Sequence, residues 1–164
     1  GGVVLFKIGD YIAHPMHGAG VIESIVTKKI NGSQRDYYVL KLPVGDMVVM
    51  VPVSGCEDIG VRSIISRSEA EKLFSAFSKI EISMTQNWNK RYRENMDKIK
   101  SGNLLDVASV IKGLMCRDSE RGLSTGERKM LHSAKQILIS ELVIATDMDY
   151  DGVEKRLCAA LKEG

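Results

Sequence analysis

The chain has few cysteines and no long apolar run, and each shortage excludes a class of protein. Its three cysteines lie at Cys56, Cys116 and Cys158, far apart and in no C-x-x-C pair. Because small disulfide-stabilised domains need paired cysteines, this odd and scattered set favours reduced thiols in a reducing compartment. No apolar run approaches the roughly 20 residues that a membrane-spanning helix needs, so we expect no membrane segment.

The chain also lacks a large excess of charge of either sign. The formal net charge is +2, which is too small to identify a nucleic-acid-binding protein without a local cluster of basic residues. Hydrophobic residues make up 44% of the chain and charged residues 27%, which are the proportions of an ordinary globular protein. The sequence shows no leader with basic, apolar and small-residue parts, so we expect the chain to be cytoplasmic.

The composition and the hydrophobic periodicity of the sequence change near residue 65, and all three prolines lie before this point. So do four short runs rich in β-branched and aromatic residues, at 11–13, 20–26, 36–42 and 47–51. Each run predicts a strand. Asn31-Gly32 predicts a tight hairpin turn between the second and third strands, because both residues accept positive φ angles. Four or five short antiparallel strands predict a small curved sheet or a partly open barrel.

From Ser66 onward the apolar residues repeat at helical spacing. Ser66 can cap a first helix, and Ser124 with Glu127 three residues later has the spacing of a capping box. Further helices are expected over about 85–100, about 104–121, from the Ser124 cap to about residue 145, and after residue 152. The second part is therefore predicted to be an all-α helical bundle, and we divide the chain into domains 3–65 and 66–164.

Basic residues gather around the only tryptophan, Trp88. Lys90 and Arg93 lie three residues apart, so a helix would place them on nearby faces. Cations in such an arrangement can neutralise DNA phosphates without distinguishing base sequence. The alternative, which the density of charge alone favours, is an ordinary solvated helix surface.

Trp88 itself has two interpretations. Apolar residues at positions 84, 88, 92, 96 and 99 repeat every three or four positions, and this periodicity favours a buried stripe. Alternatively, an aromatic side chain among cations can stack on bases or insert beside them as a wedge, which unstacks one base step in exchange for new contacts.

The histidines and glycines do not assemble a recognisable catalytic or metal site. His14 and His17 are close together, but no acidic or cysteine ligand accompanies them, and Pro15 prevents a helical pair of ligands. Gly18-Ala19-Gly20 lacks the further glycine and the helix of a nucleotide-binding loop, and it suits a tight turn or a close approach of two strands. No segment combines a nucleophile, a base and an orienting group, so we expect no enzyme, no cofactor and no metal.

Two groups of residues resemble a known family. Phe6–Asp10 followed by His14–Gly20 is similar to the opening of CarD/CdnL proteins, and to the polymerase-interacting domain of transcription–repair coupling factors. Asn87–Tyr92 followed by Arg117–Leu131 resembles the CarD C-terminal domain in order and spacing, where the coupling factors continue into a translocase. The resemblance covers nearly the whole chain.

This resemblance implies a Tudor-like first domain that binds the β subunit of bacterial RNA polymerase, and a helical domain that lies against promoter DNA. It implies that Trp88 enters the minor groove at the upstream edge of the melted bubble and stabilises the open complex. Lys90, Arg93 and Arg128 would contact the DNA backbone nearby, largely independently of sequence. A wedge of this kind favours the melted state because it binds distorted DNA better than intact duplex.

The polymerase-binding residues implied by the resemblance are Lys28 and Met50, where members of the family carry arginines. Lysine keeps the charge but loses the bidentate fork of arginine, and methionine offers only apolar contact. We therefore expect a more hydrophobic polymerase contact than in other members of the family.

Two other functions remain open. A protein-only adaptor would bind the polymerase, recruit a partner through the helical domain and leave DNA alone. A stand-alone nucleic-acid module would bind free DNA tightly, with a steep dependence on salt. We expect a monomer located at the nucleoid through RNA polymerase, with a domain-swapped dimer as the alternative state.

Overall fold

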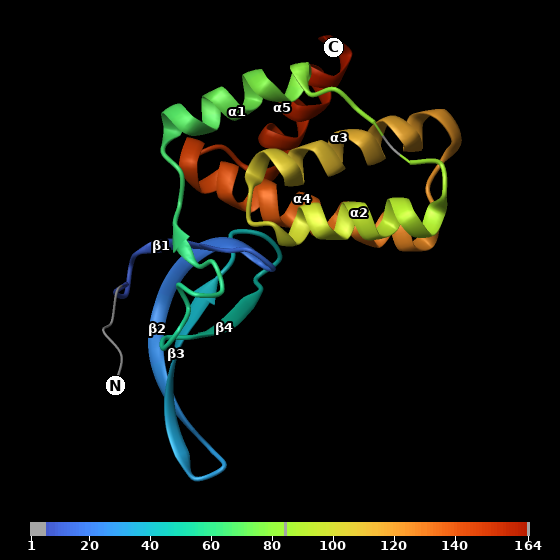
Figure 1. Ribbon diagram of the computed structural model, residues 1–164. Helices are drawn as coiled ribbons and strands as arrows, with labels where there is room; N and C mark the ends of the chain where they lie inside the picture. The colour runs from blue at the N-terminus through green and yellow to red at the C-terminus, as the bar shows by residue number, and fades with distance from the viewer. Residues whose placement is uncertain (1–5, 84, 164) are drawn as a thin grey trace.

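The computed structural model describes residues 6–83 and 85–163 as an antiparallel sheet followed by a bundle of helices (Figure 1). The strands are β1 (Tyr11–His14), β2 (Gly18–Ile30), β3 (Ser33–Lys41), β4 (Val48–Pro52) and β5 (Arg62–Ser63). The helices are α1 (Arg67–Lys79), α2 (Trp88–Lys100), α3 (Leu104–Arg121), α4 (Thr125–Thr146) and α5 (Tyr150–Glu163). Residues 3–5 and 164 of the predicted domains, and Met84 of the predicted stripe, lie outside the described residues.

The sheet has the order β4-β3-β2-β1-β5, and every neighbouring pair is antiparallel. The β2–β3 hairpin turns at Asn31 and Gly32, whose φ angles of 51° and 81° confirm the predicted turn. The hairpin is longer than predicted, because pairing continues to Ile30↔Ser33. Backbone hydrogen bonds extend the ladder where the apolar side chains stop. This polar end of the hairpin reaches past β1 and β4, away from the helices (Figure 1).

Alternation along β3 gives the sheet one buried face and one outer face. Tyr38 and Leu40 are fully buried, while Tyr37, Val39 and Lys41 face the other way. The buried face packs on a small set of apolar side chains: Ile12, Ile22, Leu42, Val51, Val53, Cys56 and Val61. The curved sheet therefore encloses a core of its own and leaves its outer face available for contacts.

Polar residues mark where the helices begin. The Ser66 hydroxyl accepts from the Glu69 backbone N–H at 3.1 Å, and the Glu69 carboxylate returns to the Ser66 backbone, so α1 starts with a full capping box. The Asn87 side chain accepts from the Lys90 backbone N–H at 3.0 Å. Because this cap defines the start of α2, the helix begins at Trp88, later than predicted.

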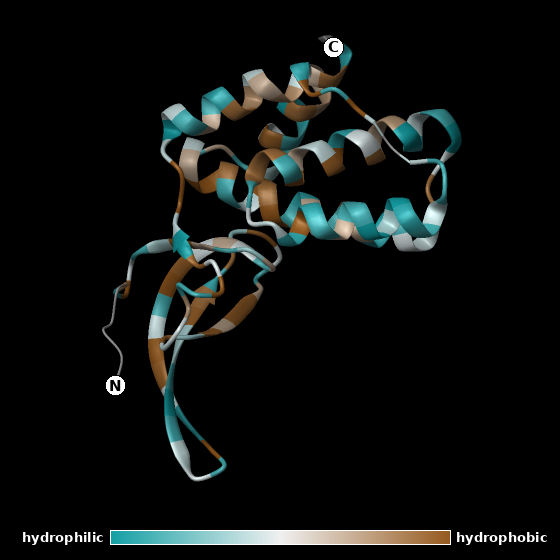
Figure 2. Cartoon of the chain, in the orientation of Figure 1, coloured by the Kyte–Doolittle hydropathy of each residue, from teal (hydrophilic) through white to brown (hydrophobic). Residues whose placement is uncertain are grey.

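Helix α4 is the centre of the helical part, since it contacts the four other helices as well as β1 and β2. The residues that face inward from α1, α3, α4 and α5 form a continuous apolar core, which includes Phe77, Ile111, Leu114, Leu138 and Leu157. Figure 2 shows these apolar faces turned towards one another, while the outward face of α2 is largely hydrophilic. The predicted helical bundle is confirmed.

A layer of polar contacts joins α4 to the sheet. The Ser140 hydroxyl accepts from the Ala19 backbone N–H at 2.8 Å, and both groups are buried. Arg62 of β5 donates two hydrogen bonds of 2.7 and 3.0 Å to the carboxylate of Glu141, which is 1% exposed and also accepts from the Ile65 backbone at 2.9 Å. The hydrogen bond to Glu141 raises the pKa of Arg62. Separating the sheet from α4 would break all of these contacts.

Two glycines allow these close approaches. Gly20 of β2 lies so near the backbone of Lys41 that a side chain would overlap it, which confirms the predicted close approach of two strands. Gly18 has a φ angle of 98° and lies against α4, where a side chain would overlap Ser140. The position of the sheet on the helices therefore depends on the absence of a side chain at residue 18.

Candidate nucleic-acid and protein interfaces

Trp88 lies at the first position of α2 and its side chain is exposed. The residue is 42% accessible, so the buried position that periodicity favours is wrong for Trp88. The indole ring stacks on the ring of Tyr92, with centroids 5.1 Å apart and planes inclined by 21°. Its Nε1–H donates to the hydroxyl of Ser124 at 3.2 Å. The indole is therefore exposed and also held by two neighbours.

The N-terminus of α4 explains this exposure. Trp88 lies over Gly126, where an added Cβ atom would be 3.5 Å from the indole Cζ2. The glycine has no side chain to cover this part of the indole, in keeping with the 42% exposure of Trp88. The positions of α2 that do become buried are Arg91, Asn95 and Ile99. The helix therefore buries a charged residue in the turn where its tryptophan is exposed.

Arg91 is the buried charge, at 2% exposure, and it pairs with Glu127 of α4. The guanidinium donates to Glu127 at 3.1 Å and to the backbone carbonyls of Thr85 and Gln86 at 3.1 and 3.0 Å. Arg117 of α3 lies 3.6 Å from the same carboxylate. Glu127 thus joins α2, α3 and α4 beside Trp88, and Arg91 does not add to the exposed positive charge.

Opposing effects act on the ionisation of Glu127. Burial raises its pKa, whereas the hydrogen bond and charge of Arg91 and the hydrogen bonds of Ser124 lower it, and the net result is a pKa below the ordinary value. The predicted capping-box spacing is correct as far as Ser124 capping α4 at 3.2 Å. The Glu127 carboxylate, however, accepts from the Ser124 hydroxyl and from Arg91 in place of the Ser124 backbone.

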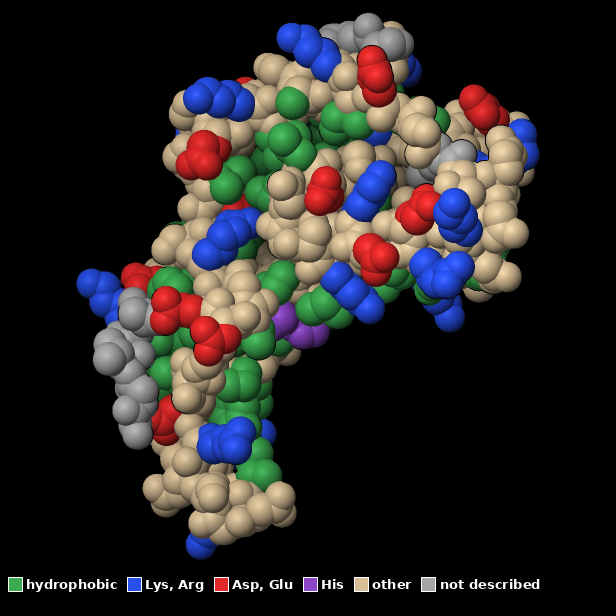
Figure 3. Space-filling model, viewed as in Figure 1, with side chains coloured by type: hydrophobic (Ala, Val, Ile, Leu, Met, Phe, Trp, Pro, Cys, Tyr) green, Lys and Arg blue, Asp and Glu red, His purple; other side chains and the backbone are tan. Residues whose placement is uncertain are grey.

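The three predicted DNA-contacting cations are exposed but do not form one cluster. Lys90 and Arg93 make no ion pair with any residue that the structure describes. At about 100° per residue they project from sides of α2 well away from that of Trp88. Arg128 pairs with Asp118 of α3 at 3.6 Å and keeps 61% of its side chain exposed. Lys90 and Arg93 therefore do not share the side of α2 that carries Trp88; Figure 3 shows Lys and Arg side chains spread over the helical part.

The outer face of the sheet carries both predicted polymerase-binding residues. Lys28 of β2 pairs with Arg35 of β3, and Met50 of β4 pairs with Val39 of β3. Directly opposed residues share a face, and positions 35 and 39 lie on the same side of β3. Four residues of strand separate the two pairs by roughly 13 Å. Lys28 and Met50 therefore share a surface but do not touch.

An apolar strip connects these two positions on the outer face. It consists of Val26, Tyr37, Val39, Val48 and Met50. Val48 and Met50 are 52% and 37% exposed. At the hairpin end of the strip Lys28 and Arg35 face each other, and neither is in an ion pair with a described residue. Arg35 is a candidate contact that sequence reasoning missed, because only strand register brings it opposite Lys28.

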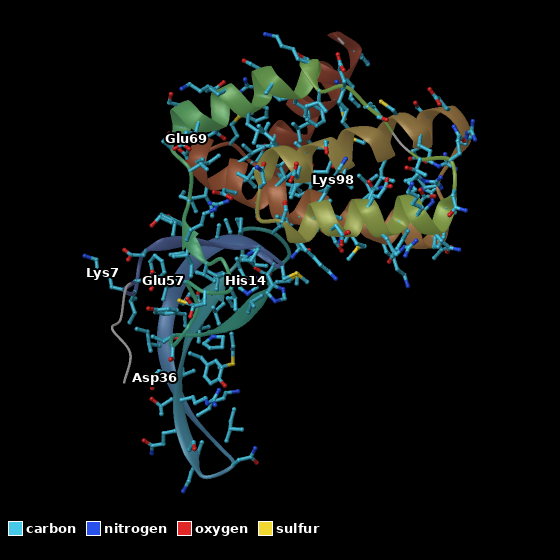
Figure 4. The ribbon with its side chains drawn as sticks, in the orientation of Figure 1. Lys7, His14, Asp36, Glu57, Glu69 and Lys98 are labelled. Atoms are coloured by element: carbon cyan, nitrogen blue, oxygen red, sulfur yellow. The ribbon has the colours of Figure 1, made fainter. Side chains whose placement is uncertain are left out.

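The two neighbouring histidines lie where the sheet meets the helices, as the label on His14 in Figure 4 shows. The His14 Nδ1 accepts from the Met16 backbone N–H at 3.0 Å, and its ring lies 4.6 Å from that of His17. Burial, followed by the charge of His17, lowers the pKa of His14. Among residues 6–83 and 85–163, no group of three or more His, Cys, Asp or Glu side chains is arranged to hold a metal ion.

These features define a class of protein: a curved antiparallel sheet packed on a helical domain that presents an exposed tryptophan. Residues 6–65 match the family model of the CarD-like/TRCF RID domain, and residues 72–158 match that of the CarD C-terminal domain. The chain is also 36% identical over 140 residues to YdeB of Bacillus subtilis (strain 168), named as a candidate transcription factor; the match covers 85% of this chain and 92% of that protein.

The chain belongs to the CarD family. Membership implies transcription regulation in association with RNA polymerase, and the matched domains are regulatory and interaction domains. None of the helices within the described residues is both long and apolar enough to span a membrane.

Proposed function

We propose that the chain binds the β subunit of RNA polymerase through the outer face of its sheet, and stabilises the promoter open complex by inserting Trp88 into the minor groove at the upstream edge of the bubble. The observation that carries this proposal is an exposed tryptophan held at the first position of α2 by Tyr92 and Ser124. The sheet would form a Tudor-like domain over residues 3–65, and the DNA-contacting domain would span residues 66–164, with no catalytic activity.

The energy of base stacking is sufficient for this function. Stacking of a base on an aromatic side chain contributes about 1–3 kcal/mol. If Trp88 gains this energy only where the duplex is distorted, it shifts the opening equilibrium by about five- to 150-fold. Because the indole already stacks on Tyr92 and Trp88 is 42% exposed, it would accept a base without rearranging the helix.

The cations would align the domain on the duplex. Lys90 and Arg93 project from other sides of α2 than Trp88, and Arg128 lies in the first turn of α4, so each would contact a different part of the DNA backbone around an inserted ring. Contacts to phosphates give affinity without sequence preference. A factor that acts at many promoters needs this kind of contact.

The sheet supports the polymerase contact. Like charges directly opposite each other destabilise a strand pair, so Lys28 and Arg35 favour a partner that supplies acidic groups. Met50 and the apolar strip would add the hydrophobic part of the interface. The pairing of Arg62 with the buried Glu141 would then hold Trp88 at a fixed position relative to the bound polymerase.

The lifetime of the open complex tests this function directly. Trp88→Ala is expected to shorten the lifetime of a polymerase–promoter complex by about five- to 150-fold relative to the wild-type chain, without loss of polymerase binding. Leu105→Ala is the matched control, because Leu105 is an apolar residue that is 50% exposed. It lies at the start of α3, close to the C-terminal end of α2 and therefore far from Trp88 at the N-terminal end of α2. An unchanged lifetime for Trp88→Ala with polymerase still bound would favour the protein-only adaptor.

A further inference from the structure

The hydroxyl of Ser124 uses its full hydrogen-bonding capacity beside Trp88. It accepts from the Trp88 Nε1–H and from the Glu127 backbone N–H, each at 3.2 Å. It also lies 3.2 Å from Glu127 Oε1, to which it donates its proton. A serine hydroxyl has one proton and two acceptor sites, so these three bonds saturate it.

The bonds form a chain that is polarised by charge. Arg91 donates to the Glu127 carboxylate, and the carboxylate accepts from Ser124, whose oxygen becomes a better acceptor for the Trp88 N–H. Hydrogen bonds that end on an ionised group are stronger than neutral ones. The indole edge is therefore held by a network anchored in the buried ion pair.

We propose that Ser124 is a positioning residue, which holds the Trp88 indole in one orientation so that its exposed part is ready to meet a base. This inference rests on the proposed function of Trp88. Ordering a mobile side chain on binding costs affinity, and a ring that is already ordered in the free protein avoids that cost. Ser124 makes no contact with DNA in this role.

The neighbours of the indole leave Ser124 as its directional contact. Tyr92 stacks on the ring and Gly126 lies near its Cζ2 atom, but both contacts permit the ring to slide or rotate in its plane. The Nε1–H bond fixes that in-plane rotation, because a hydrogen bond weakens steeply when its angle is poor. Losing the hydroxyl should therefore free the ring while leaving the stacking intact.

Three substitutions at residue 124 separate positioning from helix capping. Ser124→Ala removes the hydroxyl and the cap together. Ser124→Gly also removes the hydroxyl, but glycine at an N-cap costs the helix little stability. Ser124→Thr keeps the hydroxyl. Ser66→Ala is the matched control, because Ser66 also caps a helix with a glutamate three residues on and makes no described contact with Trp88.

The fluorescence of the free chain tests positioning without DNA, since Trp88 is the only tryptophan. Ser124→Ala and Ser124→Gly are expected to increase quenching by acrylamide and to add a fast nanosecond component to the anisotropy decay. Ser124→Thr and Ser66→Ala are expected to match the wild-type chain. Wild-type quenching and anisotropy in Ser124→Gly would overturn the proposal.

The open-complex lifetime then tests whether positioning matters for function. Loss of one hydrogen bond predicts a lifetime about two- to tenfold shorter for Ser124→Gly, recovered in Ser124→Thr. If Ser124→Gly frees the indole but leaves the lifetime unchanged, while Trp88→Ala shortens it, the positioning role is overturned. An unchanged lifetime in Trp88→Ala would instead reject the wedge, and the fluorescence result would still decide whether Ser124 holds the ring.

Discussion

Replacing Arg91 by methionine should destabilise the chain far more than a change in a basic surface cluster would. Arg91 and Glu127 are 2% and 3% exposed, so the substitution leaves a buried carboxylate without its main partner. Breaking a buried ion pair costs about 3–5 kcal/mol. Arg117 at 3.6 Å and the Ser124 hydroxyl still compensate part of the charge. We therefore expect a loss of about 3 kcal/mol of unfolding free energy, at the lower end of that range.

A double-mutant cycle measured by urea denaturation checks this value. Replacing both charges, as in Arg91→Met with Glu127→Leu, removes the uncompensated carboxylate, and apolar replacements of buried pairs are often neutral. The double variant should therefore regain about 2 kcal/mol relative to Arg91→Met, and its total cost should be well below the sum of the costs of the two single changes. Arg93→Met is the exposed control and should change stability by no more than about 0.5 kcal/mol. The reasoning is refuted if Arg91→Met matches this control, or if the two single changes simply add.

Three further predictions concern the sheet, the interface and pH. Lys28→Glu should form a favourable cross-strand pair with Arg35, so urea denaturation should show an unfolding free energy higher by about 0.2–1 kcal/mol. Titration of the polymerase with this variant should show binding weaker by about tenfold. Equal or tighter binding would count against the proposed surface. Glu141→Gln removes the negative charge that pairs with Arg62 and should lower the unfolding free energy by about 1–3 kcal/mol. It should also shorten the open-complex lifetime while polymerase binding is unchanged. A wild-type lifetime would contradict a fixed connection between the sheet and the helices. The lowered pKa of Glu127 means that its ionised form stabilises the fold. The wild-type chain should therefore be more stable than Glu127→Gln at neutral pH, and this difference in unfolding free energy should shrink as the pH falls below the ordinary pKa of 4.5. A difference that does not change with pH would show that the charge is not involved.

Local chemistry made much of the fold predictable. The Asn31-Gly32 turn and the Ser66 cap each depend on a few adjacent residues, so the sequence states them directly. The full length of the β2–β3 hairpin was not predictable from hydrophobic pattern, because its end is polar on both faces. The contact of Gly18 with Ser140 joins segments more than a hundred residues apart, and no local signal announces it.

The candidate site was predictable in its residues but not in its geometry. Helical periodicity assumes that a neighbour covers the whole length of a helix, and Trp88 lies against Gly126 in the first turn of α4 instead. Nothing in the spacing of this helix indicated that Arg91 would be buried, because its partner Glu127 lies on another helix. The spacing of Ser124 and Glu127 predicted the start of a helix, but it did not indicate the hydrogen bond between Ser124 and the Trp88 indole. These facts depend on which helix ends meet in space.

The contact of Trp88 with DNA is the central claim, and a fluorescent base measures it most directly. A promoter with 2-aminopurine at the upstream edge of the bubble reports stacking on that base as quenching of its fluorescence. With the polymerase bound, the wild-type chain and Leu105→Ala should both quench the signal, and Trp88→Ala should not. Equal quenching by Trp88→Ala, or none by the wild-type chain while it remains bound to the polymerase, would contradict the account.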